Sequence, residues 1–191
     1  MANPDEADIA ASAGADMLGL VGPMPSGAGI IDIAMAREIS QAVPAWVTPV
    51  LLTQGDTVEA IAADIAETGV RAVQLVRHVA PEVHHKLAER LPWVRRIQVV
   101  HIETDQSLDH VAMYEDLIDA FLLDSGRPSQ AELGGTGRVH DWSISAEFVR
   151  RTRVPVFLAG GLSADNVAEA ITTVRPFGVD ICSGVRTEDR L

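Results

Sequence analysis

Two features of this chain could serve a reaction. One is a carboxyl group directly after an apolar run, and the other is a pair of small residues, each pair containing glycine, at the end of two later runs. Asp124 follows the apolar residues 120–123. A carboxyl group at the end of a buried strand is partly removed from water, so its pKa can be tuned for donating or accepting a proton. Asp124 could equally cap a turn, and its position alone does not separate the two interpretations.

The glycine pairs lie where an anion could bind. Gly160 and Gly161 end the run 154–161, and Ser183 and Gly184 end the run 178–184. Glycine lets backbone N–H groups approach an anion, and in β/α barrels the loops after the last two strands often hold a phosphate. Either pair alone could be a tight turn. Two pairs separated by one helix and one strand favour an anion site.

A further glycine cluster contains Gly135, Thr136 and Gly137. Its backbone N–H groups and the threonine hydroxyl could also contact an anion. It is not a Walker A loop, because no Lys-Ser or Lys-Thr pair follows it. Taken alone, such a cluster is more often a flexible loop.

The histidines and the single cysteine give weaker indications. His101 and His140 lie near strand ends or loops and are candidates for carrying protons. Cys182 is expected to be a small buried residue on the last strand rather than a nucleophile. No His or Cys spacing suggests a zinc site, and we expect no metal.

Seven apolar runs must position these residues, and they alternate with seven stretches of helical periodicity. The apolar runs are 15–21, 46–53, 72–76, 97–102, 120–125, 154–161 and 178–184, and the helical stretches are 4–13, 32–42, 56–67, 81–91, 107–118, 143–151 and 163–174. Continuous apolar runs are typical of parallel strands buried on both faces. The alternation predicts an α/β fold of right-handed βαβ units, either an open sheet or a barrel. Pro81 suits a first helical position and Ser163 an N-cap.

Composition limits the class of protein. With 191 residues, 47% of them hydrophobic, we expect a single domain over 1–191. The net charge of -12 and the absence of a basic run argue against nucleic acid binding. There is no apolar span of about 20 residues for a membrane. The absence of a secretory signal and the lone Cys182 predict a cytoplasmic protein.

The motifs together resemble one family. Residues 120–125, 134–142, 157–166 and 175–185 are similar, in order and spacing, to the second half of phosphoribosylanthranilate isomerase, an enzyme family of tryptophan biosynthesis. Residues 12–21 and 72–75 resemble its second and fourth strands. The resemblance implies a (β/α)8 TIM-barrel-like fold that is incomplete here, with seven strands and with the first strand and the last helix missing.

The resemblance also implies a reaction. The family carries out an Amadori-type aldose–ketose isomerisation of a phosphorylated aminoribose, without cofactor or metal. Asp124 matches its general acid. The residues that match the phosphate-holding loops are Gly135, Thr136, Gly137, Gly160, Gly161, Ser183 and Gly184.

The chain departs from the family pattern in places that affect the reaction. The family's first strand carries Lys-x-Cys-Gly, whose cysteine is the general base, and the chain begins after that point. The arginine expected within 25–28 is absent, Val76-Arg77 replaces His-Gly, and Arg186 replaces a glutamate. The base would come from outside this chain or from a substitute such as His101 or Asp180.

Three hypotheses follow. The first is an isomerase of this family acting on a phosphorylated small molecule with Asp124 as acid. The second is a divergent member that binds a phosphorylated sugar or another phosphate ester without this isomerisation. The third is an interaction protein, in which a homodimer covers the open edges of the incomplete sheet.

Overall fold

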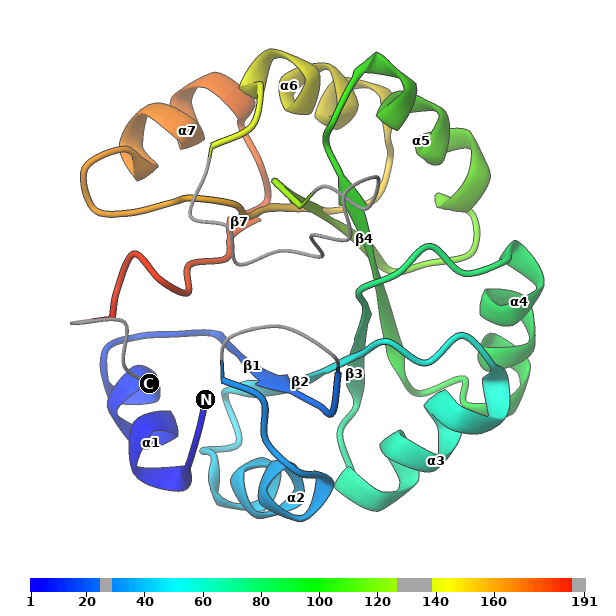
Figure 1. Ribbon diagram of the computed structural model, residues 1–191, viewed down its shortest axis with the longest axis vertical. Helices are drawn as coiled ribbons and strands as arrows, with labels where there is room; N and C mark the ends of the chain where they lie inside the picture. Colours follow the sequence, from blue (N-terminus) through cyan, green and yellow to red (C-terminus); the bar gives the residue numbers. More distant parts are fainter. Residues whose placement is uncertain (25–28, 127–138, 187–191) are drawn as a thin grey trace. The chain divides into compact units, whose positions relative to one another are not determined.

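The computed structural model describes residues 1–24, 29–126 and 139–186 (Figure 1). The chain divides into two compact units, Met1–Ile97 and Gln98–Arg190. Strand β4 (Arg95–His101) begins in the first unit and ends in the second. Within each unit the strands are neighbours in the order of the sequence. The prediction of a single domain over 1–191 stays a prediction.

In its described residues, the first unit contains four helices and the first three strands. Its elements are α1 (Pro4–Ser12), β1 (Met17–Val21), α2 (Ile33–Ala42), β2 (Thr48–Thr53), α3 (Val58–Thr68), β3 (Ala72–Leu75) and α4 (Pro81–Arg90). β1 pairs with β2 and β2 with β3, both in parallel. The helices of this unit lie on one side of its strands (Figure 1).

Local sequence explains where the helices of the first unit begin and end. The side chains of Asp32 and Thr57 cap α2 and α3 by accepting a hydrogen bond from a backbone N–H three residues later. Pro81 occupies the first turn of α4, as predicted, where a missing N–H breaks no helical hydrogen bond. Helix α3 ends at Gly69, whose left-handed φ of 71° suits glycine.

Alternate strand residues of the first unit face the helices. The buried cluster of this unit includes Leu18, Leu20, Leu51, Val73 and Leu75 from the strands and Ile39, Ile61 and Ile65 from the helices. Each such side chain contributes roughly 1.5–3 kcal/mol when fully buried. This apolar contact holds the helices against the strands.

The second unit continues the alternation. Its elements after β4 are a short 3-10 helix η1 (Asp105–Leu108), α5 (Asp109–Tyr114), β5 (Ala120–Asp124), α6 (Trp142–Arg151), β6 (Val156–Leu158), α7 (Val167–Val174) and β7 (Gly178–Val179). β5 pairs in parallel with β6, and β6 with β7. Leu123, Leu158 and Val179 are partners in this register.

The core of the second unit defines two faces of its strands. Phe121 and Leu123 of β5 and Leu158 of β6 are buried in a cluster with Phe148 of α6. The rings of Phe121 and Phe148 meet edge to face, with centroids 4.9 Å apart. Because successive side chains of a strand point to opposite faces, Asp124 points away from the helices.

The predicted alternation is confirmed in the described residues: each of the seven apolar runs overlaps a strand, and each helical stretch overlaps a helix. The start of the last helix was predicted wrongly. It begins at Val167 with Asn166 as N-cap, and not at Ser163. The physical reason is that the Asn166 side chain accepts a hydrogen bond from the N–H of Ser163, which keeps residues 163–166 in a turn. None of the described helices combines the length and apolar character needed to span a membrane.

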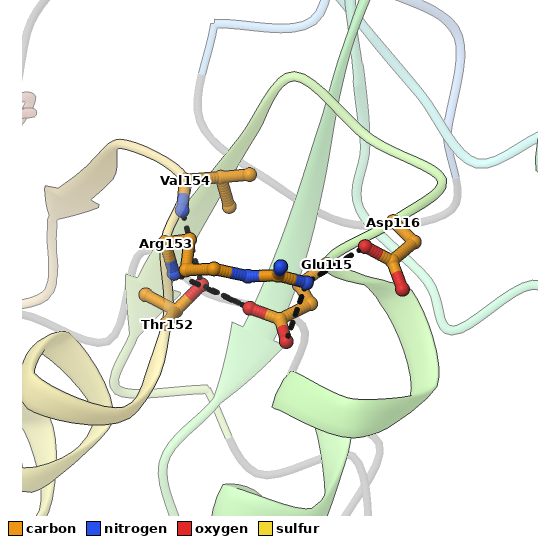
Figure 2. Close-up of polar contacts among 5 residues, drawn as sticks. All are labelled: Glu115, Asp116, Thr152, Arg153 and Val154. Carbon is orange, nitrogen blue, oxygen red and sulfur yellow. Dashed lines mark hydrogen bonds and ion pairs between the residues drawn. The ribbon is translucent and has the colours of Figure 1, made fainter.

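A polar network ties the end of α5 to the segment before β6 (Figure 2). The carboxylate of Glu115 accepts hydrogen bonds from the backbone N–H and the guanidinium of Arg153, at 3.2 and 3.3 Å, and from the Thr152 hydroxyl at 3.4 Å. Arg153 also contacts Asp116 at 2.9 Å. The bond from the Arg153 backbone N–H is the main cause that lowers the pKa of Glu115.

We expect Glu115→Gln to reduce thermal stability near neutral pH and to have little effect in acid. A lowered pKa means that the folded state stabilises the carboxylate, and this stabilisation is present above the ordinary glutamate pKa of the unfolded chain. It is lost as the pH falls through the lowered pKa. Melting temperatures measured between about pH 7 and pH 3 test this, because the wild-type and variant curves should converge at the acid end.

Asp116→Asn is the matched control. Asp116 makes a single contact with the same guanidinium and its side chain is largely exposed, so its effect should be smaller. If Glu115→Gln lowered the melting temperature by the same amount at both ends of the pH range, the expectation would be contradicted.

Candidate functional site

Asp124, the predicted acid, is the last residue of β5 and is half-buried. Its Oδ1 accepts a hydrogen bond of 2.7 Å from the N–H of Ser125. This bond orients the carboxyl group at the end of the strand. Asp124 therefore occupies the strand-end position in which α/β folds place reactive groups.

The hydrogen bonds of the strands place Asp124 in a row with three other residues. The N–H of Ala159 donates to Leu123 O and the N–H of Asp180 donates to Leu158 O, so Asp124, Ala159 and Asp180 are neighbours across β5, β6 and β7. In the same way the N–H of Ile102 donates to Asp124 O, at 2.9 Å. This bond places His101, the last residue of β4, beside Asp124.

All four residues of this row face away from the helices. Their strand neighbours Val100, Ile102, Leu123 and Leu158 are buried in the helix-packed cluster, and Val179 packs against it. Since side chains alternate along a strand, His101, Asp124, Ala159 and Asp180 project from the opposite face. We call these four residues the acid row.

Two carboxyl groups in the acid row have raised pKa values. Burial raises the pKa of Asp124, while the Ser125 hydrogen bonds and the charge of His101 act in the opposite direction. Desolvation and the charge of Asp124 raise the pKa of Asp180 to about 6, although the residue is exposed. A carboxyl with a raised pKa keeps its proton at higher pH, as a general acid requires.

His101 is held by the segment that follows β4. The residue is buried, and its carbonyl accepts a hydrogen bond of 3.1 Å from the hydroxyl of Ser107. That hydroxyl also accepts from the N–H of Glu103 at 3.4 Å. These bonds fix the strand end that presents the imidazole.

Gly160 and Gly161 form a turn at the end of β6, with φ of 84° and 65°. Such left-handed backbone favours glycine. A Cβ at position 160 would lie 2.7 Å from both the N and the Oγ of Ser125. The predicted turn therefore packs directly against the residue after Asp124, and this close approach also requires glycine.

Asn166 fixes the rest of this turn. Its side chain donates to Gly161 O and accepts from the N–H of Ser163, both at 2.9 Å. Ser163 in turn forms an isolated parallel bridge with Gly184. The two predicted glycine pairs are thus brought together, because the turn after β6 touches the segment of Ser183 and Gly184 after β7.

Some predicted residues lie outside the described part of the chain. These are Gly135, Thr136 and Gly137, together with residues 25–28. Of the others, His140 is largely enclosed, and its Nε2 lies 2.7 Å from the hydroxyl of Ser145. Burial lowers the pKa of His140 to about 4, so this histidine is neutral at pH 7. It is poorly suited to carry protons there.

The prediction that Cys182 is buried was wrong. The thiol is free and exposed, because β7 ends at Val179 and residue 182 belongs to the following loop. Among the described His, Cys, Asp and Glu residues, no group of three or more could hold a metal ion.

Sequence reasoning missed Asn166 as the residue that closes the glycine turn, and it named His101 and Asp180 without placing them. Asp180 follows an apolar run just as Asp124 does, so the same pattern could have identified it. The neighbourhood of His101 and Asp124 could not be read from the sequence, because it depends on which residues of two strands are paired.

Comparisons with known proteins agree on one family. The family model described as N-(5'phosphoribosyl)anthranilate (PRA) isomerase matches residues 5–188. The N-(5'-phosphoribosyl)anthranilate isomerase 2 of Methanosarcina mazei is 38% identical over 183 residues, which are 95% of this chain and 81% of that protein.

Solved structures of the same enzyme share the fold. A crystal structure of monomers generated from the dimeric phosphoribosylanthranilate isomerase of Thermotoga maritima matches with a TM-score of 0.81 and 28% identity, covering 99% of this chain and 87% of that one. A phosphoribosylanthranilate isomerase in complex with reduced 1-(o-carboxyphenylamino)-1-deoxyribulose 5-phosphate matches with a TM-score of 0.80 and 30% identity, over 97% and 85%. The predicted fold class, an α/β TIM-barrel-like fold, is confirmed.

We expect Gly160→Ala to destabilise the protein more than Gly69→Ala. Both glycines have left-handed backbone, but a Cβ at position 69 meets no atom within 4 Å, whereas one at position 160 overlaps Ser125. Gly69→Ala should cost about 1–2 kcal/mol in the free energy of unfolding, from the backbone alone. Gly160→Ala should cost about 1–3 kcal/mol more, from overpacking. Denaturant unfolding of both variants measures the difference, and equal costs would show that the contact with Ser125 is unimportant.

Proposed function

The chain belongs to the phosphoribosylanthranilate isomerase family, and we propose that Asp124 is the general acid of its aldose–ketose isomerisation. The substrate would be a phosphorylated aminoribose, N-(5'-phosphoribosyl)anthranilate. The observation that carries the proposal is the position of Asp124: it ends a strand, faces away from the helices and has a raised pKa.

A general acid suits the first step of this reaction. Opening the ribose ring breaks the bond between its anomeric carbon and the ring oxygen. The lone pair of the amine nitrogen forms a double bond to that carbon, and the ring oxygen must gain a proton. In this proposal the proton comes from the Asp124 carboxyl, which becomes a carboxylate. The Ser125 N–H already donates to Oδ1 and would stabilise the negative charge that remains.

The phosphate group would be held by the glycine turns. Gly160, Gly161, Ser183 and Gly184 lie in two segments that meet at the bridge between Ser163 and Gly184. Helix α7 begins directly after this turn, and the N-terminus of a helix favours an anion. Gly135, Thr136 and Gly137 complete the proposed phosphate-binding set.

The alternative function, binding of a phosphorylated sugar or other phosphate ester without isomerisation, finds no support in the comparisons. The matched relatives are named as isomerases. One matched structure of the family contains a 5-phosphate compound with a carboxyphenylamino group. Both observations favour the isomerase.

Asp124→Asn should reduce kcat/KM for N-(5'-phosphoribosyl)anthranilate by about 10²- to 10⁴-fold, because the amide cannot supply the proton. The rate of substrate consumption measures this. Calorimetric titration with inorganic phosphate and ribose 5-phosphate should give the same affinities for Asp124→Asn as for the wild type.

Asp109→Asn is the matched control, since Asp109 is exposed in the first turn of α5 and does not belong to the acid row. It should leave turnover unchanged. Equal turnover by wild type and Asp124→Asn would contradict the role of Asp124. Binding of ribose 5-phosphate by a wild type without turnover would support the alternative function instead.

We also propose a cytoplasmic homodimer. The dimer is supported by a relative described as dimeric, and the compartment by the single, free Cys182 of this chain, which suits a reducing environment. Sedimentation velocity at micromolar concentration should show a species of twice the chain mass of 20.4 kDa. A clean monomer would contradict the dimer without affecting the role of Asp124.

A further inference from the structure

In the acid row, one titratable side chain lies on each side of Asp124. His101 ends the strand next to β5, and Asp180 follows the strand beyond β6. Neighbouring strands are about 4.8 Å apart, so the backbones of Asp124 and Asp180 are separated by roughly 10 Å. Ala159 lies between them in the row and contributes only a methyl group.

The charged groups that face Asp124 within the second unit come from few elements. β4 contributes the His101 imidazole, β7 contributes the Asp180 carboxyl, and β6 contributes Ala159, which has no charge. The preceding residues on the same face, Val99, Leu122 and Phe157, are apolar. Among the described residues of this face, His101 and Asp180 are therefore the titratable neighbours of Asp124.

These two neighbours change the pKa of Asp124 in opposite directions. A positive charge on His101 lowers the pKa of Asp124. The Asp124 carboxylate raises the pKa of Asp180. Repulsion between two carboxylates is mutual, so an Asp180 that is itself charged favours the protonated form of Asp124.

We propose that His101 and Asp180 are positioning residues that act through Asp124, with Asp180 retaining the proton on Asp124 and His101 stabilising the carboxylate left after transfer. The inference rests on the proposed role of Asp124 as general acid. In the step concerned, the O–H bond of Asp124 breaks and the proton passes to the ring oxygen of the sugar. Asp180 therefore favours the protonated form of Asp124 before the transfer, and His101 stabilises its carboxylate after the transfer.

The pH dependence of kcat/KM tests this proposal. A general acid must be protonated, so activity falls as the pH rises through the pKa of Asp124. Asp180→Asn removes the repulsion and should move this fall to lower pH. His101→Gln removes the attraction and should move it to higher pH. Each displacement should be about half a pH unit or more, and the double variant should return close to the wild-type profile.

A direct titration separates this inference from the proposed function. The Asp124 carboxyl resonance, identified by its loss in Asp124→Asn, is followed against pH by NMR in the free protein. It should show the same opposed displacements in the two variants without any turnover being measured. If Asp124→Asn retains full activity, the proposed function fails. The titration still measures how His101 and Asp180 change the pKa of Asp124.

Asp109→Asn again serves as control and should displace neither profile. If either first-choice variant does not fold, Asp180→Ala or His101→Asn replaces it. Displacements in the same direction, or none in the folded variants, would overturn the proposal. A loss of kcat without any displacement would show that these residues only support the structure.

Discussion

The hydrogen-bonded register of β4 to β7 is the constraint on which the site depends. Three backbone bonds, from Ile102, Ala159 and Asp180, align His101, Asp124 and Asp180 in one row. Because the side-chain period of a strand is two, a slip of one residue would turn Asp124 toward the helices and expose Leu123. The apolar cluster around Phe121 and Phe148 opposes such a slip. Packing of the helices on one face of these strands therefore determines which side chains project from the opposite face.

Much of the fold and part of the site could be predicted from the sequence. The alternation of apolar runs and helical stretches was correct, and Asp124 ends a strand as predicted, because strand-end residues are adjacent to recognisable runs. The start of α7 was wrong because Ser163 and Asn166 are both good N-caps, and a hydrogen bond from the N–H of Ser163 to the Asn166 side chain decides between them. Cys182 was misplaced because β7 is shorter than its apolar run.

What the sequence could not supply was the relation between strands. His101 and Asp124 are 23 positions apart in the chain, and only the pairing of β4 with β5 makes them neighbours. The same holds for the contact of Gly160 with Ser125, which joins the turn after β6 to the end of β5. Both are long-range contacts between segments that local propensity treats independently. In this chain, the groups that surround Asp124 are therefore brought together by tertiary structure.

The side chain of Asn166 has a consequence for the thermodynamics of ligand binding. By bonding both Gly161 O and the N–H of Ser163, it closes residues 161–166 into a small ring of covalent and hydrogen bonds. The conformational entropy of that turn is lost when the protein folds, so binding of the proposed phosphate group would not cost it again. Ordering the turn before binding lowers the stability of the free protein by this entropy and raises the affinity for the ligand by avoiding the same cost.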